Sequence, residues 1–201
     1  MNNAFKMIAA LAALSAHSIA IGQNLTKQER AAMALTPDQI AAKTDIEGTG
    51  ELDPALWVST RSFLPKRGTD RWFRPRIDKV TGAVTYQMYI VLQSNGQGFR
   101  PNLLTFAGPN GLGNAKVERI DFQPNCSRYG CTVTEDAIAT FERSDLERAA
   151  IGATPGIDSA WDAKLFGDSV EGLTLSTFKT EIAGFLLAVD RELAKIKPMK
   201  N

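Results

Sequence analysis

The chain has 201 residues, with 23 Lys and Arg, 22 Asp and Glu and a single histidine, His17, so its formal net charge is +1. This length is enough for one sizeable hydrophobic core and predicts a single domain. His17 lies in an N-terminal segment with the features of a removable leader. Without that leader the chain has no histidine, which excludes Ser-His-Asp triads, Cys-His dyads and histidine-containing zinc sites.

Residues 1–22 have the pattern of a secretory signal peptide. Lys6 is followed by an apolar run over residues 7–16 and then by small residues that favour cleavage after Gly22 or Ala20. The run is shorter than the about 20 residues that a membrane-spanning helix needs. We therefore expect an exported protein. Because Lys6 is the only charged residue of the leader, the mature chain has equal numbers of basic and acidic residues.

Residues 23–52 are polar and alanine-rich, and they predict a helical or flexible N-terminal linker. Thr36 and Pro37 have the residue types that favour the cap and the first position of a short helix. Oxygen-bearing side chains alternate over residues 45–53 as in a calcium-binding loop, but Leu56 occupies the position of the bidentate glutamate. We therefore interpret residues 45–53 as an acidic linker and predict no metal site.

Residues 53–197 are predicted to form a single β-rich domain that ends in a helix. β-Branched and aromatic residues between turn residues predict strands at 56–60, 72–73, 83–92, 103–106, 116–122, 132–141, 161–166 and 172–175. A short helix is expected at 145–150. Apolar residues recur every three or four positions over residues 178–196, which predicts an amphipathic helix. Gly184 within it indicates close packing of the helix backbone against a sheet.

The predicted fold class is therefore α+β. We expect mainly an antiparallel β-sheet or sandwich, with the C-terminal amphipathic helix packed on it.

Cys126 and Cys131 are the only cysteines, and Gly130 precedes the second. In the oxidising compartment that an exported protein reaches, they are expected to form a disulfide. Because the sequence on both sides predicts strand, this disulfide would staple a hairpin or a sharp corner. The alternative is a redox switch, although functional cysteine pairs are more often two residues apart.

Ser176 and Lys179 fit the S-x-x-K nucleophile motif of serine β-lactamases and penicillin-binding proteins. At a helix start, one turn would bring the lysine amine near the serine hydroxyl as a base. The S-D-N and K-T-G motifs are missing, so a serine-lysine hydrolase is the alternative function. Two carboxylate pairs are further candidates for acid-base catalysis, although nothing in the sequence fixes their separation: Glu135 with Asp136, and Asp158 with Asp162.

Residues 61–79 contain seven basic and two acidic side chains, with three aromatic residues interleaved. In an exported protein this segment favours contact with an envelope protein or an anionic surface, such as lipid or lipopolysaccharide, over contact with nucleic acid. The alternative is a solvated hairpin whose arginines pair with acidic residues of the same domain. The candidate binding residues are Arg71, Trp72, Phe73, Arg74 and Arg76.

The element Cys126-Ser-Arg-Tyr-Gly130-Cys131, followed by Leu173-Thr-Leu175-Ser176 and by residues 182–189, resembles the C-terminal half of the invasion-associated locus B family. These are small exported bacterial proteins with a C-x-x-x-G-C element and a glycine-phenylalanine step in the last helix. The resemblance covers residues 115–195. It implies a protein of the periplasm or cell envelope of a Gram-negative bacterium, without known catalytic residues. We therefore predict an exported, non-enzymatic binding or accessory module without a cofactor.

Overall fold

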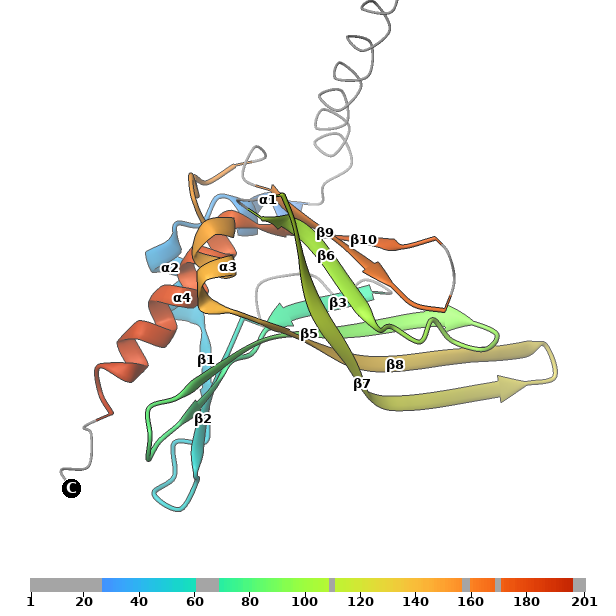
Figure 1. Ribbon diagram of the computed structural model, residues 1–201, viewed down its shortest axis with the longest axis horizontal. Helices are drawn as coiled ribbons and strands as arrows, with labels where there is room; N and C mark the ends of the chain where they lie inside the picture. The colour runs from blue at the N-terminus through green and yellow to red at the C-terminus, as the bar shows by residue number, and fades with distance from the viewer. Residues whose placement is uncertain (1–26, 61–68, 109–110, 157–159, 169–170, 197–201) are drawn as a thin grey trace, which may run out of the picture.

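The computed structural model describes residues 27–60, 69–108, 111–156, 160–168 and 171–196, and the expected signal peptide lies outside them. The helices are α1 (Lys27–Met33), α2 (Pro37–Lys43), α3 (Arg143–Ala149) and α4 (Lys179–Leu193). The strands are β1 (Asp45–Glu47), β2 (Ala55–Ser59), β3 (Thr69–Phe73), β4 (Arg76–Asp78), β5 (Val84–Asn95), β6 (Leu103–Gly108), β7 (Gly111–Ser127), β8 (Gly130–Phe141), β9 (Ala160–Phe166) and β10 (Leu173–Phe178). The antiparallel sheet with α4 packed on it confirms the predicted α+β class (Figure 1).

The strands form one bent antiparallel sheet in the order β1-β2-β4-β5-β8-β7-β6-β9-β10, with β3 also paired to β5. The long strand β7 changes partner along its length. Residues 111–116 pair with β6, and Val117 begins the pairing with β8. Phe106 of β6, Phe141 of β8 and Trp161 of β9 contact one another in the core, with ring centroids 5.5 to 6.2 Å apart. This aromatic contact links β6 and β9 on one side of β7 with β8 on its other side.

Most predicted elements are present. The differences lie in two short strands and in β7, which runs over Gly111–Ser127 instead of over the predicted residues 116–122. Thr36 caps α2 with Gln39 in a capping box, as the sequence predicts. Two strands of three residues, β1 and β4, lie where the sequence predicts none. β1 falls in the expected acidic linker, but it pairs with residues 57–59 of β2. Ile46 packs partly buried against the core, which explains why this part of the segment is an edge strand.

Helix α4 contacts β2 and β10 as well as α2 and α3 (Figure 1). Phe185 stacks on Phe73 of β3 with ring centroids 4.9 Å apart. Gly184 faces α2, where an added Cβ would lie 2.6 Å from the Cβ of Ile40 and 2.8 Å from the carbonyl oxygen of Pro37. The close approach that Gly184 permits is therefore to a helix, not to a sheet as the sequence suggested, because α2 crosses α4 at this residue.

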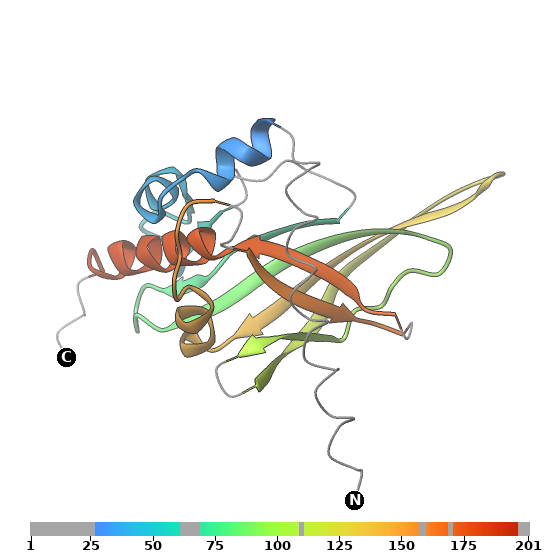
Figure 2. The same ribbon diagram turned by 90° about the horizontal axis from the view of Figure 1, so that it is seen from above.

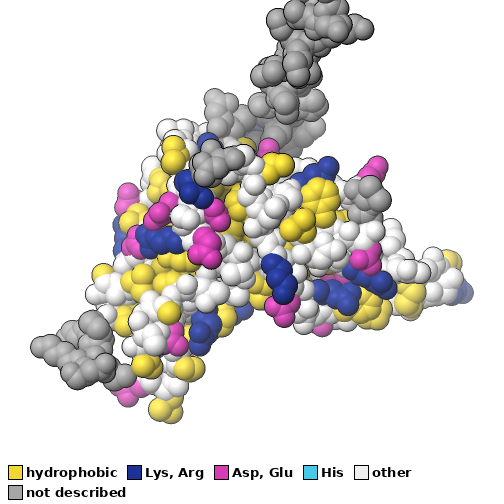
Figure 3. All heavy atoms as spheres, viewed as in Figure 1, with side chains coloured by type: hydrophobic (Ala, Val, Ile, Leu, Met, Phe, Trp, Pro, Cys, Tyr) yellow, Lys and Arg dark blue, Asp and Glu magenta, His cyan; other side chains and the backbone are white. Residues whose placement is uncertain are grey.

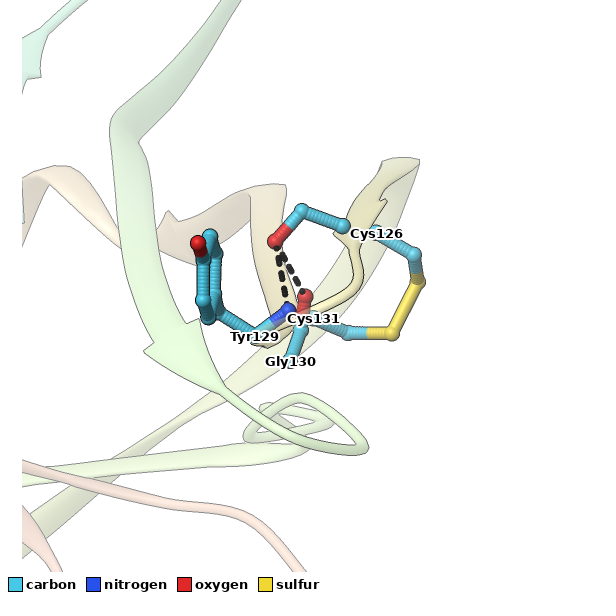
Figure 4. Close-up of a disulfide and its surroundings, with 5 residues drawn as sticks. Cys126, Tyr129, Gly130 and Cys131 are labelled. Carbon is cyan, nitrogen blue, oxygen red and sulfur yellow. Dashed lines mark hydrogen bonds between the residues drawn. A yellow bond between two sulfur atoms is a disulfide. The ribbon is translucent and has the colours of Figure 1, made fainter.

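The hairpin of β7 and β8 extends beyond the rest of the molecule, and we call residues 118–132 the arm (Figure 2). Every residue from 118 to 130 is exposed. Near the tip, Cys126 and Cys131 lie opposite each other and form a disulfide, with their Cα atoms 4.0 Å apart (Figure 4). The Ser127 hydroxyl accepts a hydrogen bond from the Tyr129 amide at 3.1 Å. The predicted stapled hairpin is thus confirmed.

We predict that Gly184→Ala lowers the free energy of unfolding by about 1–3 kcal/mol, because overpacking against α2 outweighs the gain in helix propensity. Urea denaturation measures this. Ile40→Ala should cost less in the Gly184→Ala background than in the wild type, since it removes the side chain that the new methyl group meets. An unfolding free energy that is unchanged or raised would contradict the close approach of α2.

Replacing both cysteines by serine should destabilise the arm locally. A ring this small contributes about 2 kcal/mol in the loop-closure model. The arm is exposed, so the loss should appear as local opening rather than as global unfolding. Amide hydrogen exchange should become faster over residues 120–134 and stay unchanged in β9 and in residues 86–90 of β5, which pair with residues 137–141 of β8. Faster exchange throughout the core would show that the disulfide supports the whole fold.

Candidate functional site

Adjacent residues of a strand point to opposite faces of the sheet. Phe73 of β3 and Met88 of β5 are paired and buried in the core, so they define the inner face. Their neighbours Trp72 and Tyr89 are also paired, and they lie on the opposite, outer face. Asp136 of β8 hydrogen-bonds to Tyr89 on this face. Three strands therefore bring aromatic and polar groups together.

A hollow of about 270 Å³ opens on the outer face. Its walls come from β1, β2, β3, β5 and β8, and from the residue directly after β3. The lining residues are Glu47, Ser59, Trp72, Arg74, Tyr89, Val91 and Asp136. Ligand pockets are commonly about 300–1,000 Å³. The hollow lies just below this range, so it suits a small molecule or a single side chain of a larger partner.

The centre of the hollow is an aromatic pair with a carboxylate. Trp72 stacks on Tyr89 with ring centroids 4.5 Å apart. The Tyr89 hydroxyl donates a hydrogen bond of 2.6 Å to Asp136. Burial, the hydrogen bond to Asp136 and the charge of that carboxylate together raise the pKa of Tyr89 to about 12. The phenol therefore stays a neutral hydrogen-bond donor over the physiological range.

Arg74 is the cation of the hollow, and it is already engaged. Its guanidinium donates to Glu47 at 2.8 Å and lies 4.6 Å from the centre of the Trp57 ring. Arg76, on β4, lies 3.8 Å from Asp78. On the face of the molecule that Figure 3 shows, basic and acidic side chains are interspersed.

Two of the five candidate binding residues, Phe73 and Arg71, lie on the inner face of the sheet. Phe73 is 1% exposed and belongs to the core. Arg71 is partly buried, and this burial lowers its pKa against the opposing charges of Glu181, Asp70 and Asp162. The five candidates therefore do not form one exposed surface, because alternation along β3 separates them. Only Trp72 and Arg74 line the hollow.

Glu135 and Asp136 lie on opposite faces of β8 and cannot act as a catalytic pair. Glu135 is fully buried, and its carboxylate accepts hydrogen bonds from the backbone amides of Phe99 and Arg100. It also accepts one from Arg119 at 3.3 Å. Glu135 thereby anchors the loop after β5, whereas Asp136 belongs to the hollow. Of the other proposed pair, Asp158 lies outside the described residues.

Ser176 and Lys179 lie across a strand-to-helix junction. Ser176 is in β10, opposite Asp162 of β9, and α4 begins at Lys179. The serine is thus not on the helix, and the one-turn geometry that the motif requires is absent. The Lys179 amine instead approaches the carbonyl oxygen of Ile151 at 3.4 Å.

Glu181, in the first turn of α4, is a buried carboxylate that no sequence motif predicts. It accepts hydrogen bonds from the hydroxyls of Thr60 at 2.8 Å and Thr177 at 2.6 Å. Burial raises its pKa, although both threonines and the charge of Arg71 act in the opposite direction. These hydrogen bonds join α4 to β10 and to Thr60, the residue directly after β2.

No family model matches the chain, and neither a curated protein nor a solved structure matches it. Within the described ranges, no three His, Cys, Asp or Glu side chains gather where they could hold a metal ion. The helices in these ranges include none that is long and apolar enough to span a membrane.

The raised pKa of Glu181 predicts a pH dependence of stability. The native state binds this proton more tightly than the unfolded chain, so its contribution is complete below the ordinary glutamate pKa near 4.5. It is lost as the pH rises through the folded-state pKa. Urea denaturation between pH 4 and 8 should therefore show the unfolding free energy of wild type falling relative to that of Glu181→Gln as pH rises. A constant difference would contradict this prediction.

Proposed function

We propose that the protein is an exported, non-enzymatic binding module of the bacterial envelope, and that its ligand occupies the hollow on the outer face. The observation that carries this proposal is the convergence of Trp72, Tyr89, Arg74 and Asp136 from separate elements around one concave space. Few positioned polar groups beside aromatic rings are typical of binding sites. The leader pattern and the resemblance of residues 115–195 to an exported family support the compartment.

The geometry favours recognition by the hollow over adsorption to an anionic lipid or lipopolysaccharide surface. Among the described cations of this segment, Arg74 is matched by Glu47, Arg76 lies near Asp78, and Arg71 faces Glu181 on the inner side of the sheet. Residues 61–68 of the segment lie outside the described residues. Surface attraction of the kind expected from residues 61–79 requires cations that are free to meet the surface. An envelope protein that inserts a side chain, or a small periplasmic solute, fits the hollow better.

The serine-lysine alternative has no such support. It depends on a helical turn between Ser176 and Lys179, and the helix begins only at Lys179.

In-cell photocrosslinking tests the proposal. A small diazirine amino acid replaces Val91, which lines the hollow, in the tagged protein expressed in the bacterial envelope. The matched control carries it at Val80, which is 58% exposed in the turn between β4 and β5. We expect a reproducible adduct at position 91 that is absent at position 80.

The same adduct should be lost when Asp136→Ala is added to the position 91 variant, because alanine removes the acceptor that holds the Tyr89 hydroxyl. Equal capture at positions 91 and 80, or no capture at position 91, would contradict the proposal.

A further inference from the structure

Two carboxylates face each other directly across β7 and β8. Asp121 and Asp136 are register partners at the end of the irregularity between Arg119 and Asp121. Partners in an antiparallel pair share a face, so both side chains lie on the outer face, beside Tyr89. Like charges placed directly opposite destabilise a sheet.

Neither aspartate forms an ion pair with a described cation. Asp136 accepts its hydrogen bond from the Tyr89 hydroxyl. Asp121 accepts hydrogen bonds from the Phe122 backbone amide and from the Gln123 side-chain amide. Among the described residues, Asp136 therefore brings a carboxylate without an ion pair to the hollow, and the carboxylate of Asp121 lies beside it.

The other charges of the hollow do not offset this excess. Glu47 and Arg74 neutralise each other at 2.8 Å. The stacked pair of Trp72 and Tyr89 adjoins Asp136 in the hollow, and aromatic π-systems attract cations. A cation seated in the hollow beside Asp136 would relieve the repulsion between the two carboxylates and would lie next to the aromatic pair.

We propose that the hollow binds an organic cation, namely a guanidinium or ammonium group. The group could belong to a free small amine or to a basic side chain of a protein partner, and its recognition chemistry is the same. This inference rests on the proposed function, since it assigns a ligand class to the same hollow.

Titration of the ¹⁵N-labelled mature chain with N-acetyl-arginine-N-methylamide, followed by NMR, tests the inference. The matched probe is the citrulline derivative, which has almost the same shape and no charge. Arginine keeps its charge at all accessible pH values. We expect the arginine probe to shift the amide signals of Trp72, Tyr89, Val91 and Asp136, and to bind at least about ten-fold more tightly than the citrulline probe.

Two variants and one control locate the effect. Asp136→Asn should weaken binding of the arginine probe about ten-fold or more, and the exposed Asp121→Asn should weaken it by a smaller factor without loss of the fold. Glu142→Gln removes an exposed carboxylate beyond the far end of β8 and should leave binding unchanged.

Agmatine shows whether the cation belongs to a free amine or to a protein. Tighter binding of agmatine than of the peptide probe indicates a free amine, and the reverse indicates a protein side chain.

Equal binding of the arginine and citrulline probes, or unchanged binding by both aspartate variants, would overturn the inference. The crosslinking result separates the two proposals. Capture at position 91 without cation preference rejects only the ligand class, whereas failure of both experiments rejects the hollow as a binding site.

Discussion

The structure depends on the antiparallel alignment of β5 with β8, which runs without interruption from Tyr86–Phe141 to Asn95–Thr132. Because side chains alternate along both strands, this single register decides which residues form the core and which form the hollow. Glu135 and Asp136 illustrate the constraint: the first is buried and anchors a loop, and the second holds a tyrosine on the other face. A slip of one residue would exchange their environments and bury the carboxylate of the hollow.

The arm also follows from strand geometry. The Cys131 carbonyl accepts a hydrogen bond from the Gly96 amide in the loop after β5, so the backbone of Cys131 faces away from β7. Cys126 and Cys131 are therefore a pair that does not hydrogen-bond through the backbone. Pro124, two residues earlier, has the same orientation, and its missing N–H faces away from β8. Beyond residue 116, β7 pairs only with β8 among the described strands, which leaves this edge open. Proline at that position and the irregularity at Arg119 protect the edge against pairing with another chain.

Much of the fold follows from local patterns. The β-branched run of β5 and the apolar stripe of α4 are long enough to outweigh chance, and the elements lie close to their predicted positions. β1 and β4 have three residues each, which is too few for a periodic pattern of apolar residues. They form because the neighbouring strands, β2 for β1 and both β2 and β5 for β4, supply backbone hydrogen bonds. The sequence does not show which element packs against Gly184, because α2 lies far from this residue along the chain. Alternation along β3 already separates Trp72 from Phe73, whereas the bond between Tyr89 and Asp136, 47 residues apart, has no local signature.

The charges around the hollow cannot be inferred by counting basic and acidic residues along one segment of the sequence. Residues 61–79 carry a positive excess in the sequence, yet the carboxylates that match Arg74 and Arg71 come from β1 and α4. Both arginines therefore have acidic partners within the same domain, Arg74 at the surface and Arg71 in a buried position. Reversing the charge of Arg71 would place a third acid beside Glu181 and Asp70. The uncompensated charge lies instead on Asp121 and Asp136, two residues without a basic neighbour in their ion-pair range. Among the described residues, the carboxylate of Asp136 therefore lines the hollow without an ion pair, although the segment that supplies Trp72 and Arg74 to the same hollow is basic in sequence.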